Sequence, residues 1–268
     1  MAQINFVHPS TFIVSGPTGC GKTNFVARVL REQMLREVDG MPAQRIIWFY
    51  GAEQPGLFDE LRKALSPLVK LDFQAGLDGA EGMLDTLEAT SRNIVVIDDL
   101  MQEAKDDKTV AKLFAVDSHH ANTSVFYMVQ NLFPKGAQST TISRNAHYFI
   151  LFKNPRDTGE VRTLATQMIG GKGGSRKSSS SVRTFVEIFG HVTDDKPFSY
   201  LVVDLRPETW DAYRYRTDIF PGEATRLLAL SSRKIKVARM PYATTPNTDG
   251  WLRIGPGGQN IEQNNNLE

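Results

Sequence analysis

The stretch that decides the fold is STFIVSGPTGCGKTNFVARVL, residues 10–30. An apolar run at residues 11–14 stops at a glycine-rich segment, residues 16–21, and the pair Lys22 and Thr23 follows before residues with helical spacing. Every fixed position of the GxxxxGK(S/T) pattern is matched, and the strand before it and the helix after it supply the context that the pattern requires. The stretch therefore predicts a phosphate-binding loop between a strand and a helix.

In this interpretation the whole loop contacts a nucleotide, and its residues are Gly16, Pro17, Thr18, Gly19, Cys20, Gly21, Lys22 and Thr23. The glycines let backbone N–H groups converge on phosphate oxygens at a helix N-terminus, whose dipole favours anions. Lys22 is expected to reach the β- and γ-phosphates, and the Thr23 hydroxyl to coordinate Mg²⁺. ATP and Mg²⁺ are thus the predicted ligands, and the alternative is a tight turn that binds neither. Cys20 is expected to fill space rather than to react.

Length and composition set the broad class of the protein. Of its 268 residues, 41% are hydrophobic and 23% charged, as in a soluble globular protein with one large α/β domain or two small ones. The 31 basic and 30 acidic residues nearly balance, so overall charge argues neither for nor against a nucleic-acid partner. No apolar stretch approaches the roughly 20 residues that span a bilayer, and the N-terminus lacks a secretory pattern. We therefore expect a soluble, intracellular protein without a membrane partner.

Short apolar runs alternate with segments of helical periodicity along the chain. The strand candidates are residues 11–15, 45–50, 93–97, 124–129, 147–152 and 200–205. Most of these runs are continuously apolar, which indicates strands buried on both faces, as in a parallel sheet covered by helices. The helix candidates are residues 23–38, 56–65, 80–89, 108–119 and 183–191. This alternation predicts an α/β fold, a three-layer sandwich around a mainly parallel central sheet.

The run NIVVIDDL, residues 93–100, ends a predicted strand in two carboxylates. At the carboxyl end of a buried parallel strand, both side chains would face the crevice where ligands bind. Asp98 is the candidate Mg²⁺ ligand, and Asp99 is the candidate catalytic group that orients or deprotonates the attacking water. The alternative is that the two residues simply begin the next helix.

Two further polar residues stand next to predicted strands. Gln130 follows the run SVFYMV and is a candidate for sensing the γ-phosphate or positioning water; the alternative is a polar residue that only ends the strand in a turn. Arg144 precedes another apolar run and is a candidate arginine finger that acts on a neighbouring subunit's nucleotide. Rival arginines for this role are Arg92, Arg156, Arg214 and Arg216.

Four segments together carry a resemblance to a known family: GPTGCGKT, IVVIDDL, HHANTSVFYMVQNLF and TTISRNAHYFILFKNPRD. They resemble the FtsK/HerA-type DNA-translocating P-loop ATPases, and among these the genome-packaging ATPases of double-stranded DNA viruses and of related virus-like mobile elements, the poxvirus-type branch. The likeness covers residues 10–223, and YRYRTDIFPGE looks like the end of the domain in that branch. The first two segments, Walker A and Walker B, are generic to P-loop NTPases, whereas the Gln130 strand and the Arg144 segment narrow the choice.

The resemblance implies an additional-strand sheet order, in which the strand at residues 124–129 lies between the phosphate-loop strand and the acidic strand. It also implies a homo-oligomeric ring, usually hexameric, that threads double-stranded DNA through a central channel and places an arginine at the next subunit's ATP. Capsid or portal proteins would be further partners, at a nuclear or cytoplasmic assembly site and in the virion. Many members carry Glu where this chain has Asp99, so the catalytic-base role is less firmly implied for the shorter side chain.

Residues 1–230 are predicted to form the ATPase domain, and residues 231–268 a basic, largely disordered tail. Within the domain, the Gly/Ser-rich residues 170–181 can bury almost no surface and are predicted to form a mobile basic loop. Its cations are candidate DNA contacts that grip phosphates without reading sequence, namely Lys172, Arg176 and Lys177. The alternative is a solvated linker, with the DNA contacts lying in the tail at Arg233, Lys234, Lys236 and Arg239.

Three functions fit these features. The favoured one is an ATP-driven DNA translocase that serves as the genome-packaging motor of a double-stranded DNA virus or virus-like element. The second is a nucleotide-gated DNA-binding switch, in which ATP orders loops and no DNA is pumped. The third is a helicase-like or conjugative-type ATPase. Beyond the nucleotide site, the choice among them rests on the resemblance.

Overall fold

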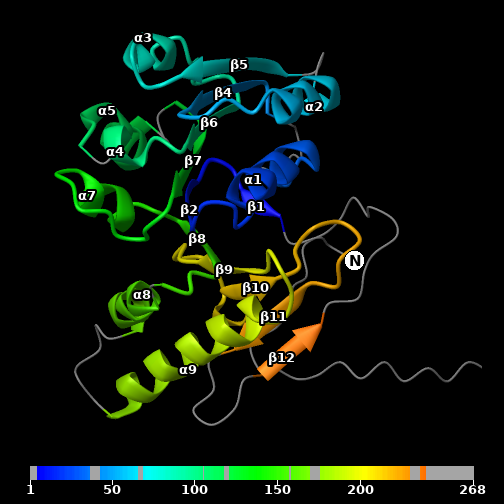
Figure 1. Cartoon of the computed structure of the whole chain (residues 1–268), viewed down its shortest axis with the longest axis vertical. Helices are drawn as coiled ribbons and strands as arrows, with labels where there is room; N and C mark the ends of the chain where they lie inside the picture. The colour runs from blue at the N-terminus through cyan, green and yellow to red at the C-terminus, as the bar shows by residue number, and fades with distance from the viewer. Residues whose placement is uncertain are drawn as a thin grey trace, which may run out of the picture.

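A computed structural model describes residues 5–36, 43–65, 69–104, 106–117, 121–156, 158–169, 176–229 and 236–239. These residues form a ten-stranded sheet with the strand order β12-β11-β10-β9-β8-β2-β7-β6-β4-β5 (Figure 1). The strands are β2 (Thr11–Ser15), β4 (Arg45–Tyr50), β5 (Lys70–Ala75), β6 (Asn93–Asp98), β7 (Thr123–Val129), β8 (Tyr148–Phe152), β9 (Tyr200–Asp204), β10 (Tyr215–Thr217), β11 (Arg226–Ala229) and β12 (Lys236–Arg239). All six predicted strands are confirmed, with ends that differ by at most one residue.

Helices cover both faces of the sheet, so the predicted three-layer α/β sandwich is confirmed (Figure 1). One face carries α1 (Lys22–Arg31) and α2 (Pro55–Leu65). The other carries α3 (Ala80–Leu84), α4 (Met101–Ala104), α5 (Lys108–Lys112) with the π-helical turn η1 (Leu113–Asp117), α7 (Ser139–Arg144), α8 (Gly159–Ile169) and α9 (Arg176–Thr193). No helix among the described residues has the length and apolar character needed to cross a bilayer.

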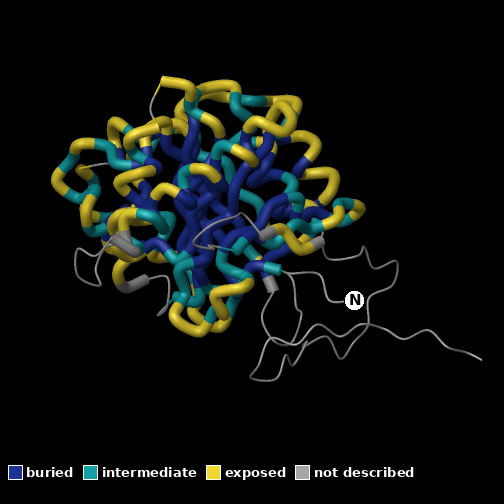
Figure 2. The backbone as a smooth tube through the Cα atoms, turned by 90° about the horizontal axis from the view of Figure 1, so that it is seen from below, coloured by how far each residue is buried: buried dark blue, intermediate teal, exposed yellow. Residues whose placement is uncertain are grey.

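The core consists of two apolar layers, one on each side of the sheet. Because successive side chains of a strand point to opposite faces, Phe12 and Val14 of β2 pack with α1, whereas Ile13 packs with the helices of the other face. Figure 2 shows the result, with buried chain through the interior and exposed chain at the outer turns. The central strands are apolar on both faces for this reason.

The half of the sheet that contains the phosphate loop is parallel. β7 pairs in parallel with both β2 and β6, and Phe126 is opposite Phe12 on one side and Val96 on the other. β8 flanks β2 in parallel on its other side. The strand at residues 124–129 therefore lies between the loop strand and the acidic strand, which confirms the predicted additional-strand order.

The other half of the sheet is antiparallel, from β8 through β9, β10 and β11 to β12. Its first strand, β9, is buried at every position. Leu201 and Val203 pack with α9, whereas Tyr200 and Val202 pack with the face of α1. An antiparallel strand covered on both faces has the same continuous apolar pattern as a parallel one, so periodicity did not reveal its direction.

Several element ends differ from the sequence predictions. The helix expected over residues 23–38 ends at Arg31, because Gln33 adopts a left-handed conformation (φ 50°) and Met34 N–H donates to the carbonyl of Val29. The short strand β3 (Leu35–Arg36) follows and pairs with β1 (Phe6–Val7). The helix expected over residues 80–89 stops at Leu84.

The region predicted as a mobile basic loop, residues 170–181, differs more from its prediction. Residues 176–181 are helical and form the first turns of α9, because an apolar face that includes Phe185, Ile188 and Val192 anchors the helix in the core. Lys172 and the side chains of Arg176 and Lys177 lie outside the described residues. The tail also differs at its beginning, where Lys236–Arg239 (β12) pairs with β11. The rest of the predicted disordered tail, residues 231–235 and 240–268, lies outside the described residues.

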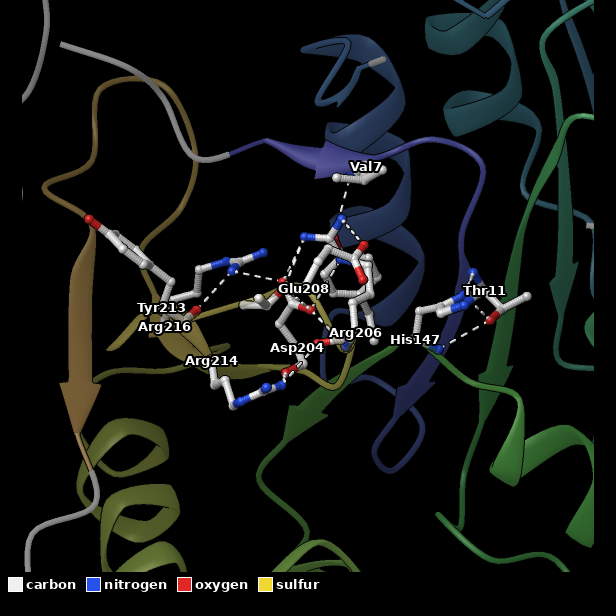
Figure 3. Close-up of polar contacts among 11 residues, drawn as sticks. Val7, Thr11, His147, Asp204, Arg206, Glu208, Tyr213, Arg214 and Arg216 are labelled. Carbon is white, nitrogen blue, oxygen red and sulfur yellow. Dashed lines mark hydrogen bonds and ion pairs between the residues drawn. The ribbon is translucent and has the colours of Figure 1, made fainter. Parts of the chain in front are cut away.

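A buried ionic cluster joins the two strands β9 and β10 (Figure 3). The Asp204 carboxylate is fully buried and accepts hydrogen bonds from Arg206 and from Arg216, whose own exposure is 2%. Arg214 donates to the backbone carbonyls of Asp204 and Arg206. Because a buried charge is tolerated only when it is paired, this cluster depends on all its members.

Removing the carboxylate tests that dependence. Asp204→Ala leaves the buried Arg216 without its acidic partner and should lower the free energy of unfolding by roughly 3–5 kcal/mol, measured by chemical denaturation. The matched control is Asp59→Ala, which breaks the exposed ion pair with Arg62 and should change stability by less than about 1 kcal/mol. Equal effects of the two substitutions would contradict this account of the cluster.

Candidate nucleotide-binding site

The glycine-rich loop turns the chain from β2 into α1 at the carboxyl edge of the parallel strands. Gly16 N–H donates to the carbonyl of Val129 at 3.1 Å, which fixes the start of the loop to the end of β7. A side chain at Gly16 would place its Cβ 2.7 Å from both Phe152 Cβ and Cys20 Sγ, so only glycine fits there. Gly21 caps α1 at φ 102°, a conformation that favours glycine. The loop therefore connects a strand to a helix, as the sequence predicts.

The first turn of α1, all of which is described, contains no acidic residue, so no carboxylate of the turn itself competes with a bound anion. Lys22 lies at its start, and its Nζ donates to the carbonyls of Gly16 at 2.6 Å and Pro17 at 3.0 Å. The ammonium is thereby held within the curve of the loop. Burial raises the pKa of the neighbouring Cys20 thiol, while Lys22 opposes that rise, so the thiol is held in its neutral form, in accordance with a packing role.

Thr23 connects this loop to the acidic strand. Its Oγ1 donates to Asp98 Oδ1 at 3.4 Å, across the position of β7 in the sheet. Asp98 has 4% of its surface exposed, and this burial raises the pKa of its carboxyl to about 6. The charge of Asp99 raises it further, whereas the Thr23 hydrogen bond and Lys22 act in the opposite direction.

The oxygen atoms here fit a magnesium ion. Within the described part of the chain, Asp98 Oδ2 is buried without a hydrogen-bond partner. The Trp48 indole lies near enough to lower the Asp98 pKa slightly. Among the described residues, however, no acceptor meets the distance and angle of a hydrogen bond to the Trp48 N–H. A hydroxyl and a carboxylate with a free, buried oxygen are hard donors of the kind that Mg²⁺ prefers. The chemistry of Thr23 and Asp98 therefore suits this ion, and their role as its ligands stays a prediction.

Asp99 and Gln130 form a second pair beside the loop. Gln130 Nε2 donates to Asp99 Oδ1 at 3.3 Å, and both side chains are exposed. Asp99 adopts a left-handed conformation (φ 56°), and its carbonyl approaches Gly51 so closely that a Cβ there would lie 2.5 Å from it. Strain of this kind gathers at functional sites. The structure thus brings Lys22, Thr23, Asp98, Asp99 and Gln130 to one edge of the sheet.

Arg144 lies elsewhere. It ends α7, just before β8 begins, and therefore stands at the amino edge of the parallel strands, which a five-residue strand separates from the carboxyl edge by about 16 Å. A groove of about 1050 Å³ opens at that edge and includes Arg144, Phe149 and Met168 in its lining, so this hollow is distinct from the phosphate loop. Arg144 cannot reach the loop of its own subunit.

The rival arginines divide by position. Arg214 and Arg216 are engaged in the Asp204 cluster (Figure 3), and Arg92 is buried at the amino end of β6. Arg156 is exposed and follows β8 at the carboxyl edge, where Phe152 packs against the loop. Of the five arginines considered, Arg156 is the one on the phosphate side.

Sequence reasoning missed three residues that lie beside the site: Gly51 next to Asp99, and Phe152 and Phe198 next to the loop. Phe152 and Phe198 both lie beside Gly21, where a Cβ would be 3.7 Å and 3.4 Å from their rings. Two of the three carry a signal, because Gly51 and Phe152 stand at the ends of predicted strands and hence at the same sheet edge. Phe198 carries none, since its position depends on the antiparallel direction of β9.

Comparison with solved structures identifies the fold. The genome packaging NTPase B204 from Sulfolobus turreted icosahedral virus 2, in complex with AMPPCP, aligns with a TM-score of 0.50 at 11% identity, over 88% of this chain and 99% of that chain. The chain has the fold of an FtsK/HerA-type P-loop NTPase. No family model matches the sequence, and no curated protein matches it either.

Two weaker similarities concern other P-loop NTPase structures. The DNA-packaging ATPase B204 from Sulfolobus Turreted Icosahedral Virus aligns with a TM-score of 0.48 at 10% identity, over 88% of this chain and 99% of that chain. EssC (ATPases 2 and 3) from Geobacillus thermodenitrificans aligns with a TM-score of 0.39 at 14% identity, over 70% of this chain and 45% of that chain. At such identities these similarities concern the fold alone.

The buried Asp98 predicts a pH effect on stability in the metal-free protein. Its folded pKa of about 6 exceeds its ordinary value of 3.8, so the folded state holds this proton more tightly than the unfolded chain. Between pH 4 and pH 7 the group should therefore reduce the free energy of unfolding by up to about 3 kcal/mol. Denaturation with EDTA present should show that Asp98→Asn lacks this loss, whereas the exposed control Asp59→Asn retains it. An unchanged pH profile in Asp98→Asn would contradict the assignment.

Proposed function

We propose that the protein is an Mg²⁺-dependent ATPase that translocates double-stranded DNA, as the genome-packaging motor of a double-stranded DNA virus or virus-like element. The observation that carries the ATPase part is the meeting of the phosphate loop with Asp98, Asp99 and Gln130 at one sheet edge. The DNA part rests on fold-level analogy with B204, whose name describes genome packaging.

Each residue of the site has a role in this proposal. The backbone N–H groups of the loop and the Lys22 ammonium bind the phosphates, and the carbonyls that now accept from Lys22 release it as phosphate oxygens replace them. Thr23 and Asp98 would hold Mg²⁺, which would supply positive charge that offsets the charge of the phosphates. Asp99 accepts a proton from the attacking water, and Gln130, hydrogen-bonded to the same carboxylate, orients that water.

DNA and neighbouring copies are the proposed partners, in a ring that is hexameric by family resemblance. Capsid or portal proteins belong to the packaging role. Lys172, Arg176 and Lys177 stay candidate DNA contacts, and the basic residues after residue 230 are their alternative. A nucleotide-gated DNA-binding switch shares the same nucleotide site, and so does a helicase-like or conjugative-type ATPase; these differ in what they do with DNA.

Turnover measured with and without double-stranded DNA tests the proposal. The purified protein should hydrolyse ATP in the presence of Mg²⁺, and DNA should raise the rate. Lys22→Ala should lose both nucleotide affinity and turnover, whereas Asp99→Asn should still bind ATP and lose roughly 10²-fold or more in turnover, because only water activation is weakened. The control Asp59→Asn, an exposed carboxylate on α2, should leave the rate unchanged.

Three results would contradict parts of this proposal. Normal turnover in Asp99→Asn would exclude it as the group that activates water. A rate that DNA does not change, with DNA binding that requires ATP, would favour the switch. Separation of a duplex into single strands would favour the helicase.

A mixing experiment tests Arg144 as an arginine finger between subunits. Its place at the amino edge means that any nucleotide it contacts belongs to another copy. Arg144→Ala and Lys22→Ala should each be nearly inactive, and a mixture of the two should regain part of the activity, because some interfaces then combine an intact loop with an intact arginine.

Arg156→Ala provides the comparison, since Arg156 lies at the phosphate edge of its own subunit. If Arg156 acts within its own subunit, mixing Arg156→Ala with Lys22→Ala should restore nothing, as no subunit then has both residues. An inactive Arg144→Ala mixture, with mixed assembly confirmed by native mass spectrometry, would exclude Arg144 from the interface role.

A further inference from the structure

If the proposed function holds, the strand order determines which end of the bound nucleotide lies on which side of the loop. Asp98, Asp99 and Gln130 lie at the carboxyl ends of β6 and β7, on one flank of the loop strand β2. The terminal phosphate must lie on that flank, next to the residues that hydrolyse it. The ribose and base then leave the loop on the opposite flank, above β8 and β9.

One side chain on that flank, Phe198, is apolar but largely exposed. Phe198 has 68% of its surface exposed, the largest fraction among the large apolar side chains of the described residues. Its backbone is also in the left-handed region, at φ 63°, which is unfavourable for a bulky residue. Its ring lies beside Gly21, where a Cβ would be 3.4 Å from Cδ1. Both the exposure and the backbone conformation cost free energy, and no contact within the described residues buries the ring.

The segment that carries Phe198 is fixed on several sides. Asp194 pairs with Lys153 at 2.6 Å, Asp195 with Arg226 at 2.9 Å, and Lys196 with Asp218 at 2.9 Å. On its other side, the buried Tyr200 accepts a hydrogen bond from Ile219 N–H. The ring is therefore presented by an ordered segment, so a ligand that covers it loses little free energy to ordering the chain.

We infer that Phe198 is the stacking platform for the nucleobase of the bound nucleotide. An exposed aromatic face next to the phosphate loop, on the flank away from the acidic residues, is where a purine ring would lie. Stacking of a base on an aromatic side chain tolerates any base, since every base has a π-face. Phe198 thus contributes affinity for the nucleoside part and leaves the phosphate contacts untouched.

Binding of two ligands separates these contributions. Isothermal titration calorimetry with AMPPCP reports base and phosphate contacts together, whereas inorganic tripolyphosphate reports phosphate contacts alone. Phe198→Ala should weaken AMPPCP binding roughly 10-fold or more and leave tripolyphosphate binding unchanged. Phe198→Tyr, which keeps the ring, should bind AMPPCP within about 3-fold of the wild type. The control Trp210→Ala removes another exposed aromatic, one that follows β9 at the amino edge, and should change neither affinity.

Other outcomes would overturn the inference. Unchanged AMPPCP affinity in Phe198→Ala would exclude stacking, and equal losses for both ligands would mean that the ring only shapes the loop. Loss of assembly with unchanged AMPPCP affinity would assign the ring to contacts between copies. A wild-type protein that binds tripolyphosphate and AMPPCP equally well would contradict the base platform but not the phosphate site, whereas one that binds neither would contradict the proposed function itself.

Discussion

The parallel pairing of β2 with β7, and of β7 with β6, is the constraint on which the candidate site depends. Phe126 is opposite Phe12 on one side and Val96 on the other, so the three strands end at the same level. The loop after β2, Gln130 after β7 and the two carboxylates after β6 are thereby brought to one edge. A shift of register in either ladder would separate the Thr23 hydroxyl from the Asp98 carboxylate.

The same edge holds the Asp98 carboxyl and the Lys22 ammonium, and their surroundings do not fully stabilise either charge. Burial raises the Asp98 pKa, and among the described residues the hydrogen bonds of Lys22 go to neutral carbonyls of its own loop. The buried Asp98 carboxylate lies beside the N-terminus of α1, whose own first turn contains no acidic residue. These groups are stabilised most when a cation and an anion bind together, and a magnesium–nucleotide complex supplies both.

The antiparallel half of the sheet matters for the site because the direction of β9 determines which residues reach the carboxyl edge. Because β9 runs opposite to β8, the segment before it reaches the carboxyl edge beside Gly21, and its far end carries the Asp204 cluster at the amino edge. The direction of β9 and β10 thus gives arginines that look alike in the sequence different surroundings. Arg216 is buried in an ion pair, whereas Arg156 is exposed beside the loop edge.

The sequence by itself determined the phosphate loop, the buried strands and the carboxylates at the end of β6, because these follow from local patterns: spacing of glycines, continuous apolar runs and the residue that ends each run. Resemblance supplied the additional-strand order. Only the tertiary structure decided the direction of β9, the early end of α1 and the helical start of α9. It also decided the position of Phe198 and the separation of Arg144 from the loop. These features depend on which strands pair and in which direction they run. Packing between residues far apart in the chain determines that pairing. Periodicity, in contrast, shows only which faces of an element are buried.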